Sequence, residues 1–442
     1  MDRMDTSLIT PAMSPERARA LAADFDLRQL PADFLANPYP VYECLRATDP
    51  VHRMPDGSWF LTRHADLVQV YRDAAVFSSD KKVEFGPKYN HPPFNQPPMA
   101  TATGHAPLFE HHTHSLVFND PPLHTRVRRI IMGALTRRAI DGMAPGLVRL
   151  VDELLDSLQA RGAGDLIEDF ASAIPVEIIG NLLDVPHADR GPLRGWSLSI
   201  LGALEPSLSP EQEAHGNASV REFLEYLRQL VAERRRRPGD PESDVLTRLI
   251  QGDGAEALSE VELLQNCVFL LNAGHETTTN LIGNALICLQ EWPQALEQLQ
   301  ADLRSAQSPS AQEDILTLAV DEFLRFESSN QLGNRRALQA TQVGGVALPA
   351  GALVTLCIGA ANRDPGVFEH PEQLNLRRQN NRHLAFGFGV HQCAGLSLAR
   401  LEGRIAIGRF LQRFPHYRLT SPPVRGGRAR FRGFLHAPFL TE

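Results

Sequence analysis

Cys393 is the residue of this sequence with the clearest setting for chemistry. It lies in the segment FGFGVHQCAG at residues 386–395, which leads into a strongly amphipathic helical pattern. A cysteine at the start of a helix has its thiolate favoured by unpaired backbone amides and by the helix dipole. Gly387, Gly389 and Gly395 have no Cβ, so the backbone can approach a flat cofactor closely. On these residues alone, a buried packing cysteine is the alternative and the more frequent outcome.

A second group of chemistry-bearing residues lies inside a long apolar helical pattern. This pattern begins at a capping box formed by Ser259 and Glu262 and ends before Pro293. At about 1.5 Å per residue the helix would span roughly 50 Å, enough to cross the molecule. Within it stands the segment AGHET at 273–277, whose threonine can bond back to a carbonyl and open a polar notch. The alternative is a buried glutamate paired with an arginine, beside an ordinary threonine.

Two pairs of charged residues have spacings that place them together. Glu322 and Arg325 are three apart, and His124 and Arg128 are four apart, so each pair shares one face of a helix. An arginine can also grip a carboxylate through two parallel hydrogen bonds. Helix-surface pairs are common and usually worth well under about 1 kcal/mol, so an ordinary solvated face is the alternative for each.

The elements that must position these residues are mostly helical. Helical periodicity dominates the middle of the chain, and strand-like alternation is found mainly at 343–348 and 352–358. We therefore predict a mainly α fold with minor β, its small sheets coming late in the sequence. No repeat or low-complexity linker divides the chain. Residues 1–442 are expected to form a single domain, with 1–35 as a poorly ordered or peripheral N-terminal segment.

Composition narrows the class of protein further. Lys plus Arg total 44 against 52 Asp plus Glu, a net charge of -8, so no global basic field suggests a nucleic-acid partner. The five cysteines form no CxxC motif, which speaks against a disulfide framework and fits a reducing cytoplasm. The most apolar long window, 268–289, is interrupted by His275 and Glu276, and the N-terminus lacks a signal-peptide core. We expect a cytoplasmic monomer that does not associate with a membrane.

The cysteine segment resembles the haem-binding signature of the cytochromes P450, FGxGxHxCxG. The matching positions are Phe386, Gly387, Gly389, His391, Cys393 and Gly395. Two further motifs of that family stand in the expected order upstream: residues 273–277 look like AGxET, and Glu322 to Arg325 look like ExxR. The resemblance extends over about 37–414, and chance agreement at so many fixed positions would be rare.

This resemblance implies the cytochrome P450 fold, a helical bundle around a buried haem b, with Cys393 as the axial ligand of the iron. A thiolate ligand pushes electron density into the iron and favours O–O cleavage. By the same resemblance, Gly274 would leave room for dioxygen, and Glu276 and Thr277 would deliver protons to it. The implied cofactor-binding residues are His124, Arg128, Arg336 and His391 at the two haem propionates, with Phe386 and Ala273 also in contact with the cofactor.

One of the implied motifs differs from the family pattern, and in another the assignment of one residue is open. The family usually shows DPPEHTRLR where this chain has DPPLHTRVR at 120–128, and Leu123 in place of glutamate puts surface capping in doubt but not the propionate contacts. The ExxR pair, Glu322 and Arg325, is implied to lock the cysteine loop from beneath together with Arg378. The sequence LRR at 376–378 leaves the register of that third member uncertain by one residue.

The resemblance also implies which parts of the chain line the substrate pocket: the segment 78–115 and the residues Phe269, Asn272 and Leu332. The segment is rich in proline and histidine and is expected to be a lid-like loop. Asn272 could hydrogen-bond a polar group of the substrate, or it could cap a carbonyl at a helix kink. The loop histidines are expected to be solvated rather than metal ligands; they are His91, His105, His111, His112 and His114.

The expected function is therefore a monooxygenase that inserts one oxygen atom of O2 into a small organic substrate, most often by C–H hydroxylation. Nothing in the chain resembles an electron-transfer module, so electrons from NAD(P)H are expected to arrive indirectly, through a flavin-containing reductase and a ferredoxin. A local basic patch could dock that acidic partner; its members would be Arg126, Arg129, Arg137, Arg138, Arg400 and Arg404. The alternatives are ordinary solvated faces for these arginines, and a peroxygenase or a haem-based sensor for the chain.

Overall fold

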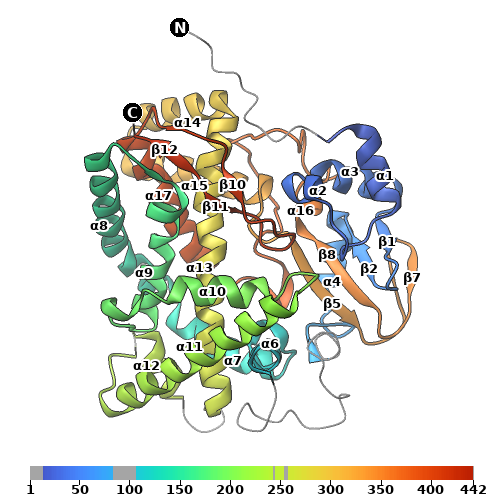
Figure 1. Cartoon of the computed structure of the whole chain (residues 1–442), viewed down its shortest axis with the longest axis horizontal. Helices are drawn as coiled ribbons and strands as arrows, with labels where there is room; N and C mark the ends of the chain where they lie inside the picture. Colours follow the sequence, from blue (N-terminus) through green and yellow to red (C-terminus); the bar gives the residue numbers. More distant parts are fainter. Residues whose placement is uncertain (1–12, 83–105, 242–243, 253–256, 442) are drawn as a thin grey trace.

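Helices surround one long central helix, and the largest β-sheet lies to one side of this bundle (Figure 1). The computed structural model describes residues 13–82, 106–241, 244–252 and 257–441. The α-helices are α1 (Pro15–Ala23), α2 (Ala32–Ala36), α3 (Tyr39–Thr48), α4 (His64–Arg72), α6 (Pro107–His114), α7 (Leu123–Ala134), α8 (Arg137–Arg161), α9 (Ala173–Leu182), α10 (Leu193–Gly202), α11 (Pro210–Arg236), α12 (Val245–Ile250), α13 (Glu260–Glu291), α14 (Pro293–Ser305), α15 (Pro309–Phe326), α16 (Ile358–Ala361) and α17 (Leu396–Arg413). The prediction of a mainly α fold with minor β is confirmed.

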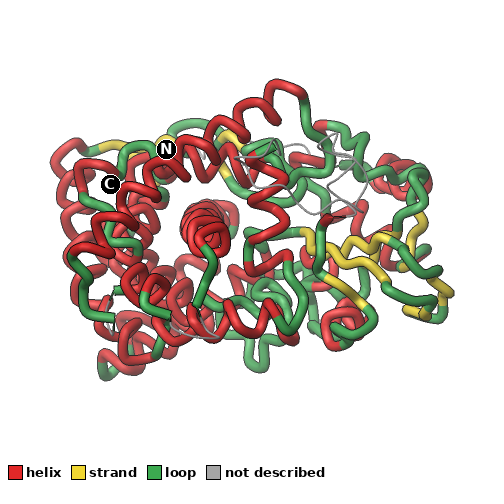
Figure 2. Tube along the Cα trace, turned by 90° about the horizontal axis from the view of Figure 1, so that it is seen from below, coloured by secondary structure: helices red, strands yellow, loops and turns green. Residues whose placement is uncertain are grey.

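Helix α13 is the central element, as its capping box predicted. The Ser259 hydroxyl accepts from the Glu262 amide at 3.2 Å, and the Glu262 carboxylate accepts from the Ser259 amide at 2.8 Å. Figure 2 shows this helix end-on inside a ring of other helices. It packs against α6, α9, α10, α11 and α17, so most of its side chains are buried all round. A helix in this position can present side chains to the interior of the protein.

The largest sheet joins strands from both ends of the chain. Its order is β1-β2-β8-β5-β3, with β2 and β8 parallel and the other neighbours antiparallel. The strands of the structure are β1 (Val51–Arg53), β2 (Trp59–Leu61), β3 (Phe77–Ser78), β4 (Ala163–Asp165), β5 (Leu332–Ala337), β6 (Thr341–Val343), β7 (Val346–Leu348), β8 (Leu353–Cys357), β9 (Arg418–Leu419), β10 (Val424–Arg425), β11 (Phe434–His436) and β12 (Pro438–Leu440). The two predicted strand regions are present, and most strands come late, from β5 onward. The sequence pattern missed β1, β2 and β3, because they are too short to show alternation.

The segment predicted to be peripheral at the N-terminus is packed from residue 13 onward. Helix α1 buries Ala18 and Ala22, and α2 buries Phe34. These side chains share a core with Tyr42 of α3 and Phe60 of β2. One or two small or aromatic anchors per short helix give no detectable period, which is why the sequence pattern missed them. Residues 1–12 lie outside the described residues.

The segment 78–115 is described at 78–82 and 106–115, and its second part is helix α6 rather than loop. His111 and His112 are 3% and 0% exposed, so the prediction that they are solvated is wrong. Their helix is held in place by packing against α11 and α13. Within the described part of the chain, no group of three histidine, cysteine or acidic side chains is placed to hold a metal ion. His91 and His105 lie outside the described residues.

Across those same ranges, no helix combines the length and the apolar character that crossing a membrane would require.

Candidate active site

The cysteine loop is a tight turn that ends at the start of α17. The Cys393 amide donates to the Phe386 carbonyl at 2.8 Å, which closes the loop. Gly387 and Gly389 have φ angles of 64° and 72°, in the left-handed region that favours glycine. A Cβ on Gly389 would collide with the Tyr71 carbonyl, whereas a Cβ on Gly395 would meet no heavy atom within 4 Å. The glycines therefore permit the turn at one end and leave open space beside the cysteine at the other.

The electrostatic setting of Cys393 differs from the prediction. Burial raises the pKa of its thiol above the ordinary value, and this outweighs the Gly395 backbone amide and the positive charges of Arg128 and Arg400, which lower it. A cysteine thiol ionises readily when a metal ion supplies the balancing positive charge.

The ion pair beneath the loop is completely buried. Arg325 donates to both carboxylate oxygens of Glu322 at 2.8 Å, and both side chains are 0% exposed. Arg378 adds a third bond to Glu322 at 3.0 Å, whereas Arg377 pairs with Asp302 on the surface. The predicted third member, Arg378, is therefore confirmed, and the register is resolved.

Arg325 also organises the backbone that leads to the cysteine loop. Its guanidinium donates to the carbonyls of Asn362, Pro371 and Gln373 at 2.8–3.0 Å. The side chain of Asn362 in turn accepts from the Leu384 amide at 2.6 Å, two residues before the loop begins. The network thus connects α15 to the segment that positions Cys393.

Basic side chains gather on the other side of the loop, close to one another and short of acceptors. The rings of His124 and His391 are 4.0 Å apart between centroids. Both ring nitrogens of His124 and Nε2 of His391 are buried without a hydrogen-bond partner. Burial, with a contribution from neighbouring positive charges, lowers the pKa of His124 to about 4 and of His391 to about 2. This cluster is built to receive negative charge.

Arg335, not Arg336, belongs to this cluster. Its positive charge acts on both His124 and His391, and it is 8% exposed. Successive side chains of a strand point to opposite faces, so in β5 only one of the two neighbouring arginines can face the histidines. The prediction of Arg336 was therefore wrong by one residue. Arg128 is half-buried and close enough to Cys393 for their charges to interact.

One face of α13 borders open space in the interior. Ala273 is exposed and Gly274 and Thr277 are partly exposed, although the residues around them in the helix are buried. The Thr277 hydroxyl donates to the Ala273 carbonyl at 2.7 Å, one turn earlier, as the helix-interior position suggested. A Cβ on Gly274 would collide with Ile179 of α9, so this glycine serves helix packing. The proposed polar notch is present at Thr277.

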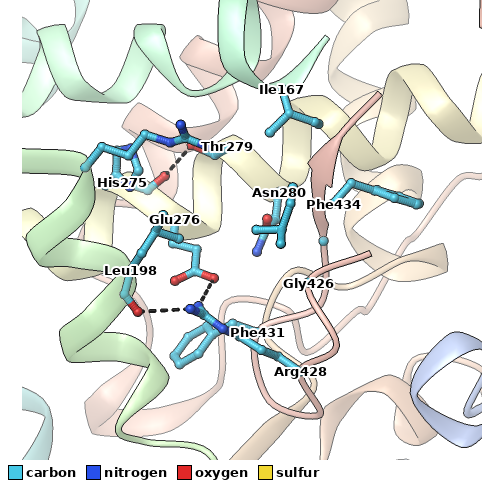
Figure 3. Close-up of a pocket in the computed structure, with 13 residues that line it drawn as sticks. Ile167, Leu198, His275, Glu276, Thr279, Asn280, Gly426, Arg428, Phe431 and Phe434 are labelled. Atoms are coloured by element: carbon cyan, nitrogen blue, oxygen red, sulfur yellow. Dashed lines mark hydrogen bonds and ion pairs between the residues drawn. The ribbon is translucent and has the colours of Figure 1, made fainter. Parts of the chain in front are cut away.

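Glu276 lies on the side of α13 that faces the C-terminal strands. It is 5% exposed and forms an ion pair of 2.6 Å with Arg428 (Figure 3). Burial raises the pKa of Glu276 to about 7, although Arg428 and Arg194 lower it, and Glu205 adds to the rise. A carboxyl group with this pKa populates both its acid and its base form near neutral pH.

The structure places the three residues predicted to line the substrate pocket in different surroundings. Asn272 donates through Nδ2 to Nε2 of His111 on α6 at 3.2 Å, and its Oδ1 is buried without a hydrogen-bond partner, so a hydrogen bond to the substrate stays a prediction. The side chain of Leu332 is 0% exposed and packs in the N-terminal core, which contradicts its place in the pocket. Phe269 is partly buried against the main core.

Comparisons with known proteins decide what this arrangement is. A family model described as cytochrome P450 matches residues 201–425. The biotin biosynthesis cytochrome P450 of Bacillus subtilis is 33% identical over 392 residues, covering 88% of this chain and 92% of that protein. The chain belongs to the cytochrome P450 family. Cytochrome P450 monooxygenases are oxidoreductases, and this protein is one of them.

Other members of the cytochrome P450 family are similarly related. The vitamin D(3) 25-hydroxylase of Pseudonocardia autotrophica is 36% identical over 391 residues, covering 88% of this chain and 89% of that enzyme. Among solved structures, P450BioI in complex with hexadec-9Z-enoic acid ligated acyl carrier protein superposes with a TM-score of 0.82 at 31% identity. The match covers 93% of this chain and 100% of that one, so the cytochrome P450 fold extends over nearly the whole protein.

The family implies a haem cofactor, and the described residues of this cytochrome P450 fit one. Haem needs a sulfur ligand, space for a flat ring and partners for two carboxylates. Cys393 meets the first need, and the open positions beside Gly395 and at Ala273 meet the second. The unpartnered nitrogens of the histidine cluster meet the third.

Sequence reasoning missed three residues of this site. Strand alternation could not choose between Arg335 and Arg336, because the two buried ends of β5, Leu332 and Ala337, are five residues apart and lie on opposite faces of the strand. Arg428 had no signal, since it follows its partner Glu276 by 152 residues. The pairing of Asn272 with His111 was also hidden, because nothing in the sequence marked 107–114 as a helix that packs on α13.

Proposed function

We propose that this protein is a single-domain haem-thiolate monooxygenase that hydroxylates a C–H bond of a small organic substrate. The reaction consumes the substrate, O2, NAD(P)H and one proton, and yields the hydroxylated product, water and NAD(P)+. The two electrons come from NAD(P)H through a flavin-containing reductase and a ferredoxin. The observation that carries this proposal is the pair of groups on α13, a buried carboxyl that can hold a proton and a hydroxyl beside open space.

Each residue of the haem site has a proposed task. Cys393 would ligate the iron, and His124, Arg128, Arg335 and His391 would hold the two propionates. Bound haem supplies the site for reduction and cleavage of dioxygen, with the thiolate donating electron density. Glu322, Arg325 and Arg378 keep the cysteine loop in shape.

The proton chemistry belongs to the chain itself. Oxygen reduction to water consumes protons, and Glu276 can release one near neutral pH and take up another. The hydrogen of the Thr277 hydroxyl is committed to the Ala273 carbonyl, so its oxygen lone pairs are left to accept. Thr277 can therefore hold a proton-donating water in the open space. A gas sensor needs no proton relay, so this pair favours an oxygenase over the sensor alternative. Dependence of product formation on NAD(P)H distinguishes the monooxygenase from a peroxygenase.

Replacing Thr277 by alanine tests this function. We expect haem content and substrate binding to change little, because one hydroxyl is lost from a helix whose cap is independent. Proton delivery should suffer, since a positioned acid–base relay contributes on the order of 10² to 10⁴ in rate. The measurement is product formed and hydrogen peroxide released per NAD(P)H, with a saturating true substrate. Thr277→Ser keeps the hydroxyl and is the control; an alanine variant that stays coupled would remove Thr277 from the mechanism.

The relatives suggest that the reaction class is shared and the substrate is not. Their names include biotin biosynthesis, polyketide biosynthesis and 25-hydroxylation of vitamin D(3). We infer that the substrate of this chain is likewise a small organic molecule, selected by side chains near α6 and α13. Spectral shifts of the haem band across a compound library would identify it.

The docking patch for the ferredoxin is proposed at the start of α8 and on α17. Arg126 is excluded, because it pairs with Glu262 and the Ala257 carbonyl and so holds the start of α13. Arg400 and Arg404 also pair with acids, on α15. Arg137 lies 3.6 Å from Asp141, but its side chain remains 95% exposed, and Arg138 beside it is exposed too. These two are the best placed to meet an acidic partner.

Charge reversal at this patch should slow electron delivery. We expect Arg137→Glu with Arg138→Glu to slow reduction by the native ferredoxin about tenfold at low salt, because charge steering raises association rates by about 10- to 1,000-fold. The effect should shrink as salt rises, since screening limits surface charges to about 10 Å at 0.1 M. Arg19→Glu on α1 is the control. If stopped-flow reduction is equally fast in all three proteins, the partner docks elsewhere.

A further inference from the structure

Arg428 reaches from the C-terminal hairpin to two helices at once. The hairpin consists of β10, β11 and the turn 426–433 between them. One guanidinium nitrogen, Nη1, donates to Glu276 of α13 at 2.6 Å, and Nη2 donates to the carbonyl of Leu198 in α10 at 3.0 Å (Figure 3). The forked guanidinium is suited to such a double contact. The position of Glu276 thus depends on where the hairpin turn lies.

The hairpin turn is itself fastened by a second acid. Glu205, just after α10, accepts from the amides of Ala429 at 2.9 Å, Arg430 at 3.0 Å and Phe431 at 3.3 Å. Hydrogen bonds to an ionised group are about twice as strong as neutral ones. Arg430 adds bonds to the carbonyls of Leu204 and Leu332 at 2.9 and 2.7 Å. The turn is therefore clamped to the end of α10 and to β5.

Arg428 also separates two pockets. The inner pocket, about 20 Å³, is lined by Glu276, His275 and Arg194 among others. The outer pocket, about 710 Å³, is wider and opens between α10, the start of α11 and the loop before α2. Arg428 and Leu198 line both. Any exchange between the outer pocket and Glu276 passes this arginine.

Several polar atoms at the inner pocket have no hydrogen-bond partner. Glu276 Oε2, both ring nitrogens of His275, Arg194 Nε and Asn280 Nδ2 are buried without a hydrogen-bond partner. A site needs roughly 10–15 Å³ and two to four polar partners to hold a water molecule. The inner pocket meets both conditions for one water next to the free oxygen of Glu276.

We propose that Arg428 is a positioning residue of the proton relay: it orients Glu276 so that one carboxyl oxygen faces the water of the inner pocket, and Glu205 keeps it in place by clamping the hairpin turn. This inference rests on the proposed function, since it assigns Glu276 to proton delivery. The step is a proton transfer from the pocket water to the carboxylate and from the carboxyl group onward toward Thr277. No bond to carbon or change of oxidation state is involved.

The charges around Glu276 decide in which direction its pKa should move when Arg428 is removed. The groups that face it are Arg428 of the hairpin, Arg194 of α10, Glu205 after α10 and His275 of its own helix. Burial raises the pKa of Glu276 to about 7 and Arg428 opposes that rise. Without Arg428 the pKa must go higher, so the protonated form of the carboxyl group would persist to a higher pH than in the native protein.

The first measurement is the infrared band of the protonated Glu276 carboxyl group, followed against pH in the substrate-free ferric holoenzyme. The band is assigned by its loss in Glu276→Gln. In Arg428→Gln we expect its midpoint to rise by about 1–3 units, the effect of removing an opposite charge at close range. Arg428→Lys keeps the charge and should return the midpoint close to the native value.

The second measurement is product per NAD(P)H in the same proteins. For Arg428→Gln we expect a fall of about tenfold, part of the roughly 10² to 10⁴ that a positioned acid–base group contributes. Arg428→Lys should recover part of the loss, because lysine pairs with Glu276 but lacks the fork that also reaches Leu198. Glu205→Gln should lower product per NAD(P)H by less than Arg428→Gln, because it loosens the turn but leaves the Arg428 side chain in place. The infrared midpoint is not the readout for this variant, since Glu205 itself raises the pKa of Glu276 and its removal acts in the opposite direction. Glu211→Gln, on the rim of the outer pocket, is the matched control.

The outcomes separate the two proposals. If Arg428→Gln keeps both the native midpoint and the native coupling while Glu276→Gln uncouples, Arg428 has no positioning role and the proposed function stands. If Glu276→Gln and Thr277→Ala also stay coupled, the relay itself fails. Should Arg428→Gln not retain haem, Glu205→Gln and Arg428→Lys decide: native coupling in Glu205→Gln overturns the clamp, and a lower product yield per NAD(P)H there supports it.

Discussion

Cys393→Ala is expected to abolish the long-wavelength Soret band that reduced, carbon monoxide-treated thiolate haem proteins show. The native protein should display that band, because Cys393 lies in a closed loop with open space beside Gly395. The nearby histidine cluster has unpartnered ring nitrogens that can bind the haem carboxylates. Alanine offers no ligand atom to the iron. The measurement is the reduced difference spectrum of freshly prepared protein, together with haem content.

The matched control for this prediction is another cysteine. Cys44 is half-buried in α3, in the N-terminal core, and Cys44→Ser should leave the spectrum unchanged. The assignment of Cys393 would be wrong if the undenatured native protein showed a spectrum typical of histidine ligation. It would also be wrong if Cys393→Ala kept the thiolate band.

The parts of the site that the sequence predicted are those whose members lie close together in the chain. Cys393 shares a ten-residue segment with its glycines, and Glu322 and Arg325 share one helical turn. Arg378 was predicted from the resemblance, and only the structure could choose between it and Arg377, because one residue decides between a buried and a surface partner. Local spacing thus fixes local geometry.

The parts of the site and the fold that the sequence did not predict depend on contacts between residues that are distant in the sequence. The choice between Arg335 and Arg336 depends on which face of β5 is inside, and a one-residue slip reverses it. Arg428 meets Glu276 only because the hairpin folds back onto α10 and α13. Strand β2 pairs with β8 across most of the chain, and neither short strand carries a periodic signal strong enough to predict the other. In each case tertiary packing, rather than propensity, decides the outcome.

Arg325→Ala is expected to destabilise the protein strongly. Its guanidinium makes two bonds to Glu322 and three to backbone carbonyls, all buried or partly buried. Removing it leaves Glu322 as a buried carboxylate whose remaining partners include Arg378, Asn375 and Asn381. Breaking a buried ion pair by deleting one partner costs about 3–5 kcal/mol. We therefore expect a large fall in the urea midpoint of the holoenzyme.

Haem retention should fall together with stability, because the same guanidinium holds the Asn362 carbonyl, and the Asn362 side chain holds the Leu384 amide before the cysteine loop. Arg377→Ala is the matched control: it removes the same side chain one position from Arg378, but its partner Asp302 lies at the surface, where ion pairs contribute little. Urea unfolding followed by haem absorbance and by tryptophan fluorescence measures both effects. Equal midpoints for the two variants would show that the buried network neither stabilises the fold nor supports the loop that carries Cys393.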